Sequence, residues 1–422
     1  MQQAAFAATM KSMDSGDHSS ELLVEDPHRS IPTHGGGSAP NANGRKVFYL
    51  VDSLNVGGTE VQAVELATRL CSERYAVTLG CLRARGPLLA KLKGSAVTIQ
   101  EFYPKGGFDS VGGIYQLFRL ARFLRREKFQ IVHTHDFYSN VLGIPAALIA
   151  RVPVIVSSQR DLGHLNLYKT HRRVWLRRLQ KMSAAVLTNA NAVRDALLTE
   201  SSLPPEKVWV IHNGVDLERF RNPSRDRAWL GLGANTANEK WIVLVGSMYS
   251  DVKGHPWLIA AAQSIVREFP DVRFLLVGDG VQRPEFENQV EQLGVARNFS
   301  FVGGRDDVPA ILACCDMGVL PSRAEGLPNA VLEYLAAGLP TIASRVGGNL
   351  EIIRDGETGL LVPPEDASAL AAAILRLLRE TGLASALARN GQSFVTTNFS
   401  FQRMIERIDR LYTELLHSRG RA

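Results

Sequence analysis

The sequence predicts an α/β protein made of two doubly wound, Rossmann-like domains. From Lys46 onward, short β-branched and apolar runs alternate with segments of helix length. Such runs are typical of parallel strands that helices cover on both faces. The alternation starts again after a stretch rich in Pro, Gly and Asn at Asn222–Asn238. A chain of 422 residues is also too long for one ordinary hydrophobic core.

The predicted strands fall into two sets. The first set is KVFYLV, AVTLGCL, VTIQEF, IVHTH, VPVIVSS, AVLTN and VWVIHN. The second set is WIVLVGS, FLLVGDG, FSFVGG, MGVLPS, PTIAS and TGLLVPP. Ligands of such sheets bind beyond the carboxyl ends of the strands, so two facing domains predict a binding cleft between them.

We divide the chain into four parts on this pattern. They are a disordered tail (residues 1–44), a first Rossmann-like domain (45–215), a second Rossmann-like domain (216–395) and a C-terminal helix segment (396–422). We expect the last helix, at about Phe401–Leu416, to cross back to the first domain.

Composition and charge narrow the class of protein. The tail has two basic and five acidic residues, so the overall net charge of +6 becomes +9 for residues 45–422. A folded part this basic favours an anionic partner, such as a nucleoside diphosphate or a phospholipid surface. The four cysteines form no C-x-x-C pair, which argues against a disulfide framework or a zinc site. No apolar run approaches the ~18 residues of a membrane-spanning helix. We expect a cytoplasmic protein.

The stretch Ser322–Ser344 places two glutamates, Glu325 and Glu333, eight positions apart. A buried strand ends at Ser322, Pro328 suits a first helical position, and Gly338 suits the residue after the helix. The unpaired N–H groups at such a helix start attract phosphate, and carboxylates accept hydrogen bonds from vicinal sugar hydroxyls. The stretch therefore fits a nucleotide sugar, although a capping glutamate and a surface glutamate explain the spacing equally well.

Two further motifs follow strands of the first domain. In NVGGTE, Gly57 and Gly58 allow the backbone to approach a phosphate or an acceptor closely, or they form a plain strand–helix turn. In IVHTHD, His133 and His135 face the same side of the strand. His135 is nearer the carboxyl end, whereas His133 reads as a packed histidine. No third metal ligand is suggested, and we expect no metal.

These pieces together resemble the retaining glycosyltransferases of the GT-B fold, of the family 4-like, group 1 type. EGLPNAVLEYLAAGLPTIAS carries the glutamate pair, and the others are GGTE, IVHTHD, HNGVD, VGSMYSDVKG, FVGGRDDVP and VGGNLEIIRDGETGLLVPPED, in the right order. The resemblance implies two Rossmann-like domains that face each other, residues 45–215 on the acceptor side and residues 216–395 binding the nucleotide sugar. It also implies hexosyl transfer from that nucleotide-sugar donor. It implies retention of configuration with no cofactor and no metal.

The resemblance also assigns roles to single residues. It implies catalytic roles for His135, Lys253 and Glu325. It implies donor-binding roles for Gly57, Gly58, Ser247, Lys253, Arg305, Glu325, Gly326, Leu327, Asn329 and Glu333. In this family an arginine usually follows the glycine of VGSMYSDVKG, where this chain has Ser247. We expect Arg305, or Arg160 on the acceptor side, to supply the missing cation.

Two basic stretches bear on the acceptor. They lie at Arg119–Lys128 and Tyr168–Lys181. In the second, helical spacing predicts that Trp175, Leu179 and Met182 share one face and that Arg173, Arg177 and Lys181 take the opposite, exposed one. A basic amphipathic helix can lie on an anionic membrane, or it can be a solvated helix of the core. We expect a lipid-linked or polysaccharide-precursor glycan as acceptor and peripheral attachment to the inner face of a membrane.

Three alternatives stay open. A nucleotide-sugar epimerase of the same fold would change the sugar without an acceptor. A degenerate, non-catalytic nucleotide-sugar binder is favoured only by Ser247. Nucleic-acid binding is disfavoured, because the basic stretches lack interleaved aromatic residues or a known RNA module.

Overall fold

A computed structural model describes residues 44–71, 74–108, 110–160, 162, 170–221, 224, 226–232 and 239–419. The predicted tail, except its last residue, lies outside these ranges. So do Tyr168 and Lys169 of the second basic stretch.

The first sheet has seven parallel strands in the order β3-β2-β1-β4-β5-β6-β7. They are β1 (Arg45–Ser53), β2 (Tyr75–Arg83), β3 (Thr98–Glu101), β4 (Ile131–His135), β5 (Val154–Gln159), β6 (Ala185–Thr188) and β7 (Val208–Val210). The helices between them are α2 (Gly58–Leu70), α3 (Leu88–Leu92), α4 (Val111–Glu127), α5 (Asp136–Ala150), α6 (Thr170–Met182), α7 (Asn191–Glu200) and the 3₁₀ turn η2 (Pro205–Lys207). Both faces of the sheet are apolar and buried, which is why the strands read as continuous hydrophobic runs.

The second sheet has six parallel strands in the order β10-β9-β8-β11-β12-β13. They are β8 (Lys240–Val245), β9 (Val272–Val277), β10 (Phe299–Gly303), β11 (Met317–Leu320), β12 (Thr341–Ser344) and β13 (Leu360–Val362). Its helices are α8 (His255–Glu268), α9 (Arg283–Gln292), α10 (Val308–Ala313), α11 (Asn329–Ala336), α12 (Asn349–Ile352), α13 (Ala367–Arg379) and α14 (Thr381–Asn398). Short 3₁₀ turns are η3 (Leu217–Phe220), η4 (Ala228–Leu230), η5 (Asp251–Lys253) and η6 (Ala296–Asn298). The two-sheet α/β fold predicted from the sequence is confirmed.

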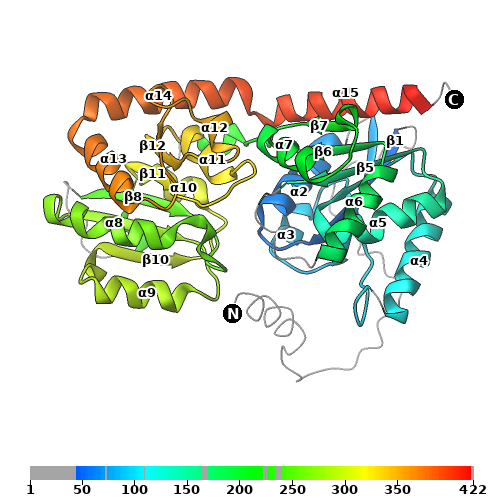
Figure 1. Ribbon diagram of the computed structural model, residues 1–422, viewed down its shortest axis with the longest axis horizontal. Coiled ribbons are helices and arrows are strands. Elements are labelled where there is room, and N and C mark those ends of the chain that lie inside the picture. The colour runs from blue at the N-terminus through cyan, green and yellow to red at the C-terminus, as the bar shows by residue number, and fades with distance from the viewer. Residues whose placement is uncertain are drawn as a thin grey trace.

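The last helix, α15 (Phe401–Arg419), packs on the first sheet, although it follows the second sheet in the chain (Figure 1). Phe401, Met404, Ile408, Leu411 and Tyr412 belong to the same buried cluster as the strands of the first sheet. The chain therefore crosses between the two sheets twice, once near Gly214 and once near Ser400. Val215 and Ser400 pair at this crossing.

The exposed face of α6 differs from the expected one. Trp175 and Met182 are 50% and 55% exposed, whereas Leu176 and Leu179 are buried. Arg177 donates to Gln159 and pairs with Glu200, which also holds Arg173, and Lys181 donates to Ser202. The prediction that Arg173, Arg177 and Lys181 form the free face of this helix was wrong. The end of α7 lies beside α6 and engages those side chains, so an amphipathic pattern alone misplaced the two faces.

Candidate active site

Several of the predicted site residues lie at the two topological switch points of the sheets, whereas Arg160 follows β5 and Arg305 follows β10. In the first sheet the strand order reverses between β1 and β4, and in the second between β8 and β11. Gly57 and Gly58 follow β1, and His135 ends β4. Lys253 follows β8, and Glu325 follows β11. A switch point is where α/β sheets bind ligands, because the loops on either side diverge there and leave a crevice.

Glu325 is a buried carboxylate held on two sides. The Lys253 ammonium donates to its Oε1 at 2.8 Å and to its Oε2 at 3.0 Å. The Ser322 hydroxyl donates to Oε1 at 2.8 Å. The structure thus brings two of the three predicted catalytic residues into direct contact, across loops that are 72 residues apart in sequence.

The loop that carries Glu325 presses against the first domain. A Cβ atom on Gly326 would lie 2.2 Å from the carbonyl oxygen of Arg160, so only glycine fits there. Behind the loop, the Gly348 N–H donates to the Gly326 carbonyl at 2.8 Å. These contacts fix the backbone of Gly326 and Leu327 directly before α11. Pro328 is the N-cap residue of α11 rather than its first helical residue.

The start of α11 is tied to the start of α2. The Asn329 side chain donates to the Gly58 carbonyl at 3.2 Å, and its Oδ1 accepts from Gln62 at 3.2 Å and from Asn213 at 2.9 Å. Gln62 also exchanges two hydrogen bonds with the backbone of Gly214. The side chain of Asn329, which the resemblance places in donor binding, is therefore occupied as a bridge between the domains. Two helix N-termini converge here, and each is electropositive.

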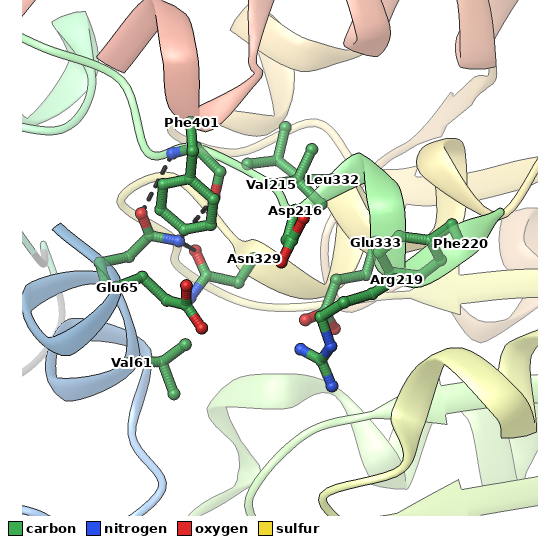
Figure 2. Close-up of a pocket in the computed structure, with 12 residues that line it drawn as sticks. Val61, Glu65, Val215, Asp216, Arg219, Phe220, Asn329, Leu332, Glu333 and Phe401 are labelled. Carbon is green, nitrogen blue, oxygen red and sulfur yellow. Dashed lines mark hydrogen bonds between the residues drawn. The ribbon is translucent and has the colours of Figure 1, made fainter. Parts of the chain in front are cut away.

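Glu333 faces a pocket between the two domains. Figure 2 shows its carboxylate beside the Arg219 guanidinium, across the pocket from Val61 and Glu65 of α2. The pocket is lined by Val61, Gln62, Glu65, Gly214, Val215, Asp216, Arg219, Phe220, Asn329, Leu332, Glu333 and Phe401. Burial raises the pKa of the Glu333 carboxyl to about 7, while the charges of Arg219 and Lys91 act in the opposite direction.

The two histidines of β4 have different surroundings. His133 is hydrogen-bonded to Tyr412 and to Ser158, both at 2.7 Å, and is a packed histidine as expected. His135 is buried, and neither ring nitrogen has a hydrogen-bond partner. Burial, with added repulsion from His133 and Arg160, holds the pKa of His135 well below its usual range. A neutral imidazole with two unused nitrogens is suited to a hydroxyl group of a ligand.

Arg305 and Arg160, the two candidates for the missing cation, differ in how fully their guanidinium groups are hydrogen-bonded. The Arg305 guanidinium makes two hydrogen bonds to Asp307, at 2.8 and 2.6 Å, and lies over the ring of Trp229. Its charge is thus already compensated. Arg160 is buried and donates to Asn213 Oδ1 at 3.1 Å through one nitrogen only. Ser247 is exposed in the loop that follows β8.

Two carboxylates of the first domain were not singled out from the sequence. Asp52 accepts from the Ser139 N–H at 2.8 Å, and burial together with the charges of Asp136 and Glu60 raises its pKa. Asp136 has a φ of 68°, an uncommon backbone conformation for a residue other than glycine. Their position directly after β-branched runs, at carboxyl ends, was the signal that could have found them.

The comparisons with known proteins cover both domains. A glycosyltransferase family 4 domain matches residues 56–219, and a glycosyl transferases group 1 domain matches residues 239–380. The UDP-Gal:alpha-D-GlcNAc-diphosphoundecaprenol alpha-1,3-galactosyltransferase of Escherichia coli is 27% identical over 362 residues, which is 82% of this chain and 91% of that protein. The alpha-D-kanosaminyltransferase of Streptomyces kanamyceticus is 27% identical over 338 residues, which is 75% of this chain and 86% of that protein.

Solved structures agree in fold. The Anabaena protein HepE, in complex with UDP and glucose, superposes with a TM-score of 0.78 at 24% identity, covering 88% of this chain and all of the other. A sucrose-phosphate synthase from Thermosynechococcus elongatus gives a TM-score of 0.75 at 22% identity, covering 89% of this chain and all of the other. The two matches cover β2 to β7 of the first sheet and all six strands of the second sheet, in chain order. The chain therefore belongs to the glycosyltransferases of the GT-B fold.

Proposed function

We propose that this glycosyltransferase moves a hexose from a nucleoside-diphosphate sugar to a lipid-linked or polysaccharide-precursor glycan, with retention of configuration and without a metal ion. The observation that carries the proposal is the pairing of Lys253 with Glu325 beside the convergent starts of α2 and α11. The cation proposed to hold the diphosphate and the carboxylate proposed to accept from sugar hydroxyls then lie in direct contact.

The donor is proposed to lie along α11. The free N–H groups of Gly326 and Leu327 and the Lys253 ammonium would hold the diphosphate. Glu325 would accept from sugar hydroxyls, and Glu333, which lines the pocket between the domains, would accept from the ribose. UDP is the nucleotide in the E. coli relative's name and in the HepE complex, which supports a uridine donor.

Retention is proposed to proceed without a covalent intermediate on Glu325. Both oxygens of that carboxylate are bound by Lys253, and Oε1 also accepts from Ser322, so it is a weak nucleophile. The acceptor hydroxyl would attack the anomeric carbon on the face that the diphosphate leaves. Its proton would pass to the departing phosphate oxygen. Lys253 and the helix starts would stabilise the charge that develops on the phosphate.

The acceptor side is proposed to face an anionic membrane. No helix of the described ranges is both long and apolar enough to span a bilayer. Eight of the thirteen exposed large hydrophobic side chains in those ranges lie on α4, α5 and α6: Val111, Ile114, Tyr115, Phe118, Ile149, Val174, Trp175 and Met182. Together α4 and α6 contain nine arginine and lysine residues and one acid, Glu127.

The outer face of α4 carries both exposed apolar and exposed basic side chains along the helix axis. Val111, Ile114, Tyr115 and Phe118 are exposed along its first two turns, and Arg122, Arg125 and Arg126 along its last two. An apolar stripe that continues into a basic one fits the boundary between acyl chains and anionic headgroups. The diphosphoundecaprenol acceptor in the E. coli relative's name agrees with a membrane-bound acceptor.

A donor assay with product analysis tests the proposal. The purified protein is incubated with a panel of nucleoside-diphosphate sugars, with and without a polyprenyl-diphosphate-linked sugar, and with a metal chelator present. We expect acceptor-dependent release of the nucleoside diphosphate and a product whose anomeric proton coupling matches that of the donor. Conversion of the donor sugar without an acceptor would instead identify an epimerase, and binding without turnover would identify a non-catalytic binder.

A further inference from the structure

We propose that Arg160, which directly follows β5 of the first domain, binds a diphosphate group and supplies the cation that Ser247 does not. The inference rests on the proposed function, since it takes the substrate to contain a diphosphate. It concerns a residue on the opposite side of the cleft from Lys253, and it makes the charge of the site depend on both domains.

The first argument is the burial of a charge that no direct ion pair balances. Arg160 is 4% exposed. One guanidinium nitrogen donates to Asn213, whereas Nε and the other terminal nitrogen have no hydrogen-bond partner in the described structure. The Asp136 carboxylate attracts the charge of Arg160, but no carboxylate in the described ranges forms an ion pair with it. A buried guanidinium without a direct ion pair is unfavourable, so an anion from outside the chain would stabilise it.

The second argument is the position of the guanidinium. Its partner Asn213 also donates to the Leu327 carbonyl at 3.1 Å and to Asn329 Oδ1 at 2.9 Å, at the start of α11. The Arg160 carbonyl, in turn, leaves no room for a side chain at Gly326. Arg160 therefore lies beside the loop whose N–H groups would hold phosphate oxygens.

The third argument is that neighbouring polar atoms are also unused. His135 is buried with both ring nitrogens unpartnered, and Asn189 is buried with its Oδ1 unpartnered. A Cβ atom on Gly326 would lie 3.1 Å from that Asn189 oxygen. His135, in turn, lies close enough to Arg160 for the guanidinium charge to lower the pKa of the imidazole. Buried polar groups in native proteins almost always find partners, so several unused ones near Arg160 indicate a polar ligand.

The remaining argument is the charge of the site. The Lys253 ammonium is shared with both oxygens of Glu325, and Arg305 is bound to Asp307. Ser247 is neutral. Of Lys253, Arg305 and Arg160, only Arg160 makes no ion pair with a carboxylate in the described part of the chain, while a diphosphate gains negative charge as it leaves. Diphosphate oxygens occur both in a nucleotide-sugar donor and in a polyprenyl-diphosphate acceptor.

Calorimetry with UDP, in the absence of acceptor, tests the donor as the source. Arg160→Gln should weaken UDP binding by at least tenfold, and Arg160→Lys should weaken it less. Adding Ser247→Arg to Arg160→Gln should recover most of the affinity, since it returns a positive charge to the site from the other side. Arg376→Gln, an exposed arginine paired with Glu380 on α13, is the matched control and should bind UDP as the parent does.

If the diphosphate that Arg160 binds belongs to the acceptor, the result differs. The UDP affinity of Arg160→Gln should then equal that of the parent. The KM of this variant for a polyprenyl-diphosphate-linked acceptor should rise at least tenfold, and the KM of the control variant should not. If UDP affinity and this KM are both unchanged, the proposal is overturned. A parent protein that binds UDP but is indifferent to Arg160→Gln removes this inference alone. A parent that binds no nucleoside diphosphate removes the proposed function as well.

Thermal unfolding of the ligand-free variants separates binding from a structural role. Removal of an uncompensated buried charge should leave the Tm of Arg160→Gln equal to or above that of the parent. A clear fall in Tm, with UDP affinity and acceptor KM both preserved in Arg160→Lys and Arg160→Gln, would mean that Arg160 only holds Asn213 in place.

Discussion

At the scale of single residues, Glu333 combines a pocket position with a shifted pKa. It lies between the domains, where carboxylate oxygens can accept from two ribose hydroxyls. Glu333→Ala should therefore weaken binding of a nucleoside diphosphate by more than tenfold, in line with the roughly 1.5–3 kcal/mol of a charged hydrogen bond. Calorimetry measures this, with Glu291→Ala on the exposed face of α9 as control. Unchanged affinity would contradict the ribose assignment.

The same residue predicts a pH dependence of stability. Burial raises the folded-state pKa of Glu333 to about 7, above the value of 4.5 that it has when exposed. The folded state then holds this proton more tightly than the unfolded state. The contribution to stability is complete below pH 4.5 and is lost as the pH rises towards 7 and above.

Glu333→Gln removes this titration. The parent should lose stability between pH 5 and pH 8 through Glu333, and the variant should not. The free energy of unfolding of Glu333→Gln minus that of the parent should therefore increase by more than about 1 kcal/mol over this pH range. Urea denaturation of the ligand-free proteins at both pH values measures the difference. Parallel stability curves for the two proteins would show that Glu333 has an ordinary pKa.

At the scale of elements, Glu351 of α12 caps a helix of the other domain. Its carboxylate accepts from the Asn191 side chain at 2.7 Å and the Ala192 N–H at 3.1 Å, at the start of α7, and contacts His212 at 2.8 Å. Burial alone would raise the pKa of Glu351, but these hydrogen bonds lower it to about 2. A negative charge at a helix N-terminus is favourable, and here it joins two domains.

Because the pKa of Glu351 is lowered rather than raised, its contribution to stability changes with pH in the opposite direction to that of Glu333. The stabilising contribution of Glu351 is present above pH 4.5 and is lost as the pH falls towards 2. Glu351→Gln should thus lower the free energy of unfolding by about 1–2 kcal/mol at pH 7 and by less at pH 3. Denaturant unfolding at the two pH values tests this, with Glu357→Gln, an exposed acid paired with Arg354, as control. An equal loss at both pH values would exclude a charge effect.

The exposed stripe of α4 makes the proposed membrane contact testable. Ile114→Ser combined with Phe118→Ser should reduce pelleting with anionic vesicles by at least tenfold, since burying each apolar side chain contributes about 1.5–3 kcal/mol. The parent should pellet with vesicles that contain phosphatidylglycerol and not with neutral ones, and salt should weaken this association. Val281→Ser, at a similarly exposed residue of the second domain, is the control. Equal pelleting of the double variant and the parent would assign this face to another role.

At the scale of the whole molecule, α15 follows the second sheet in the chain but is hydrogen-bonded to the central strands of the first sheet. The Tyr412 hydroxyl donates to the hydroxyl of Tyr49 at 2.9 Å and is hydrogen-bonded to His133 at 2.7 Å, all within the buried interior. Tyr412→Phe should therefore destabilise the protein by about 1–3 kcal/mol, because it leaves buried polar groups unpaired. Thermal unfolding measures this effect. Phe401→Leu, a change of apolar shape in the same cluster, should cost less if the hydrogen bonds matter more than the packing.

Several features of this protein follow from the sequence by itself. The thirteen strand-like runs correspond to the seven and six strands of the two sheets in the described ranges, since a strand buried on both faces needs a continuous apolar run. The loop before α11 and the separation of Glu325 and Glu333 are also local, because a turn and one helix set them. The glycosyltransferase family was likewise recognisable from motif order along the chain.

Other features were decided only by the tertiary structure, because they depend on residues far apart in sequence. The pattern of α6 could not tell that Glu200 and Ser202 engage its arginines and lysine. The motif GGRDD does not reveal that the Asp307 carboxylate binds the Arg305 guanidinium. The motif around Asn329 does not reveal that its side chain bridges Gln62, Asn213 and Gly58. The burial of Arg160 without an ion pair to any carboxylate of the described ranges arises where two domains meet. Burial and pairing are properties of the assembled surfaces, so the charge available at the cleft is set by the fold.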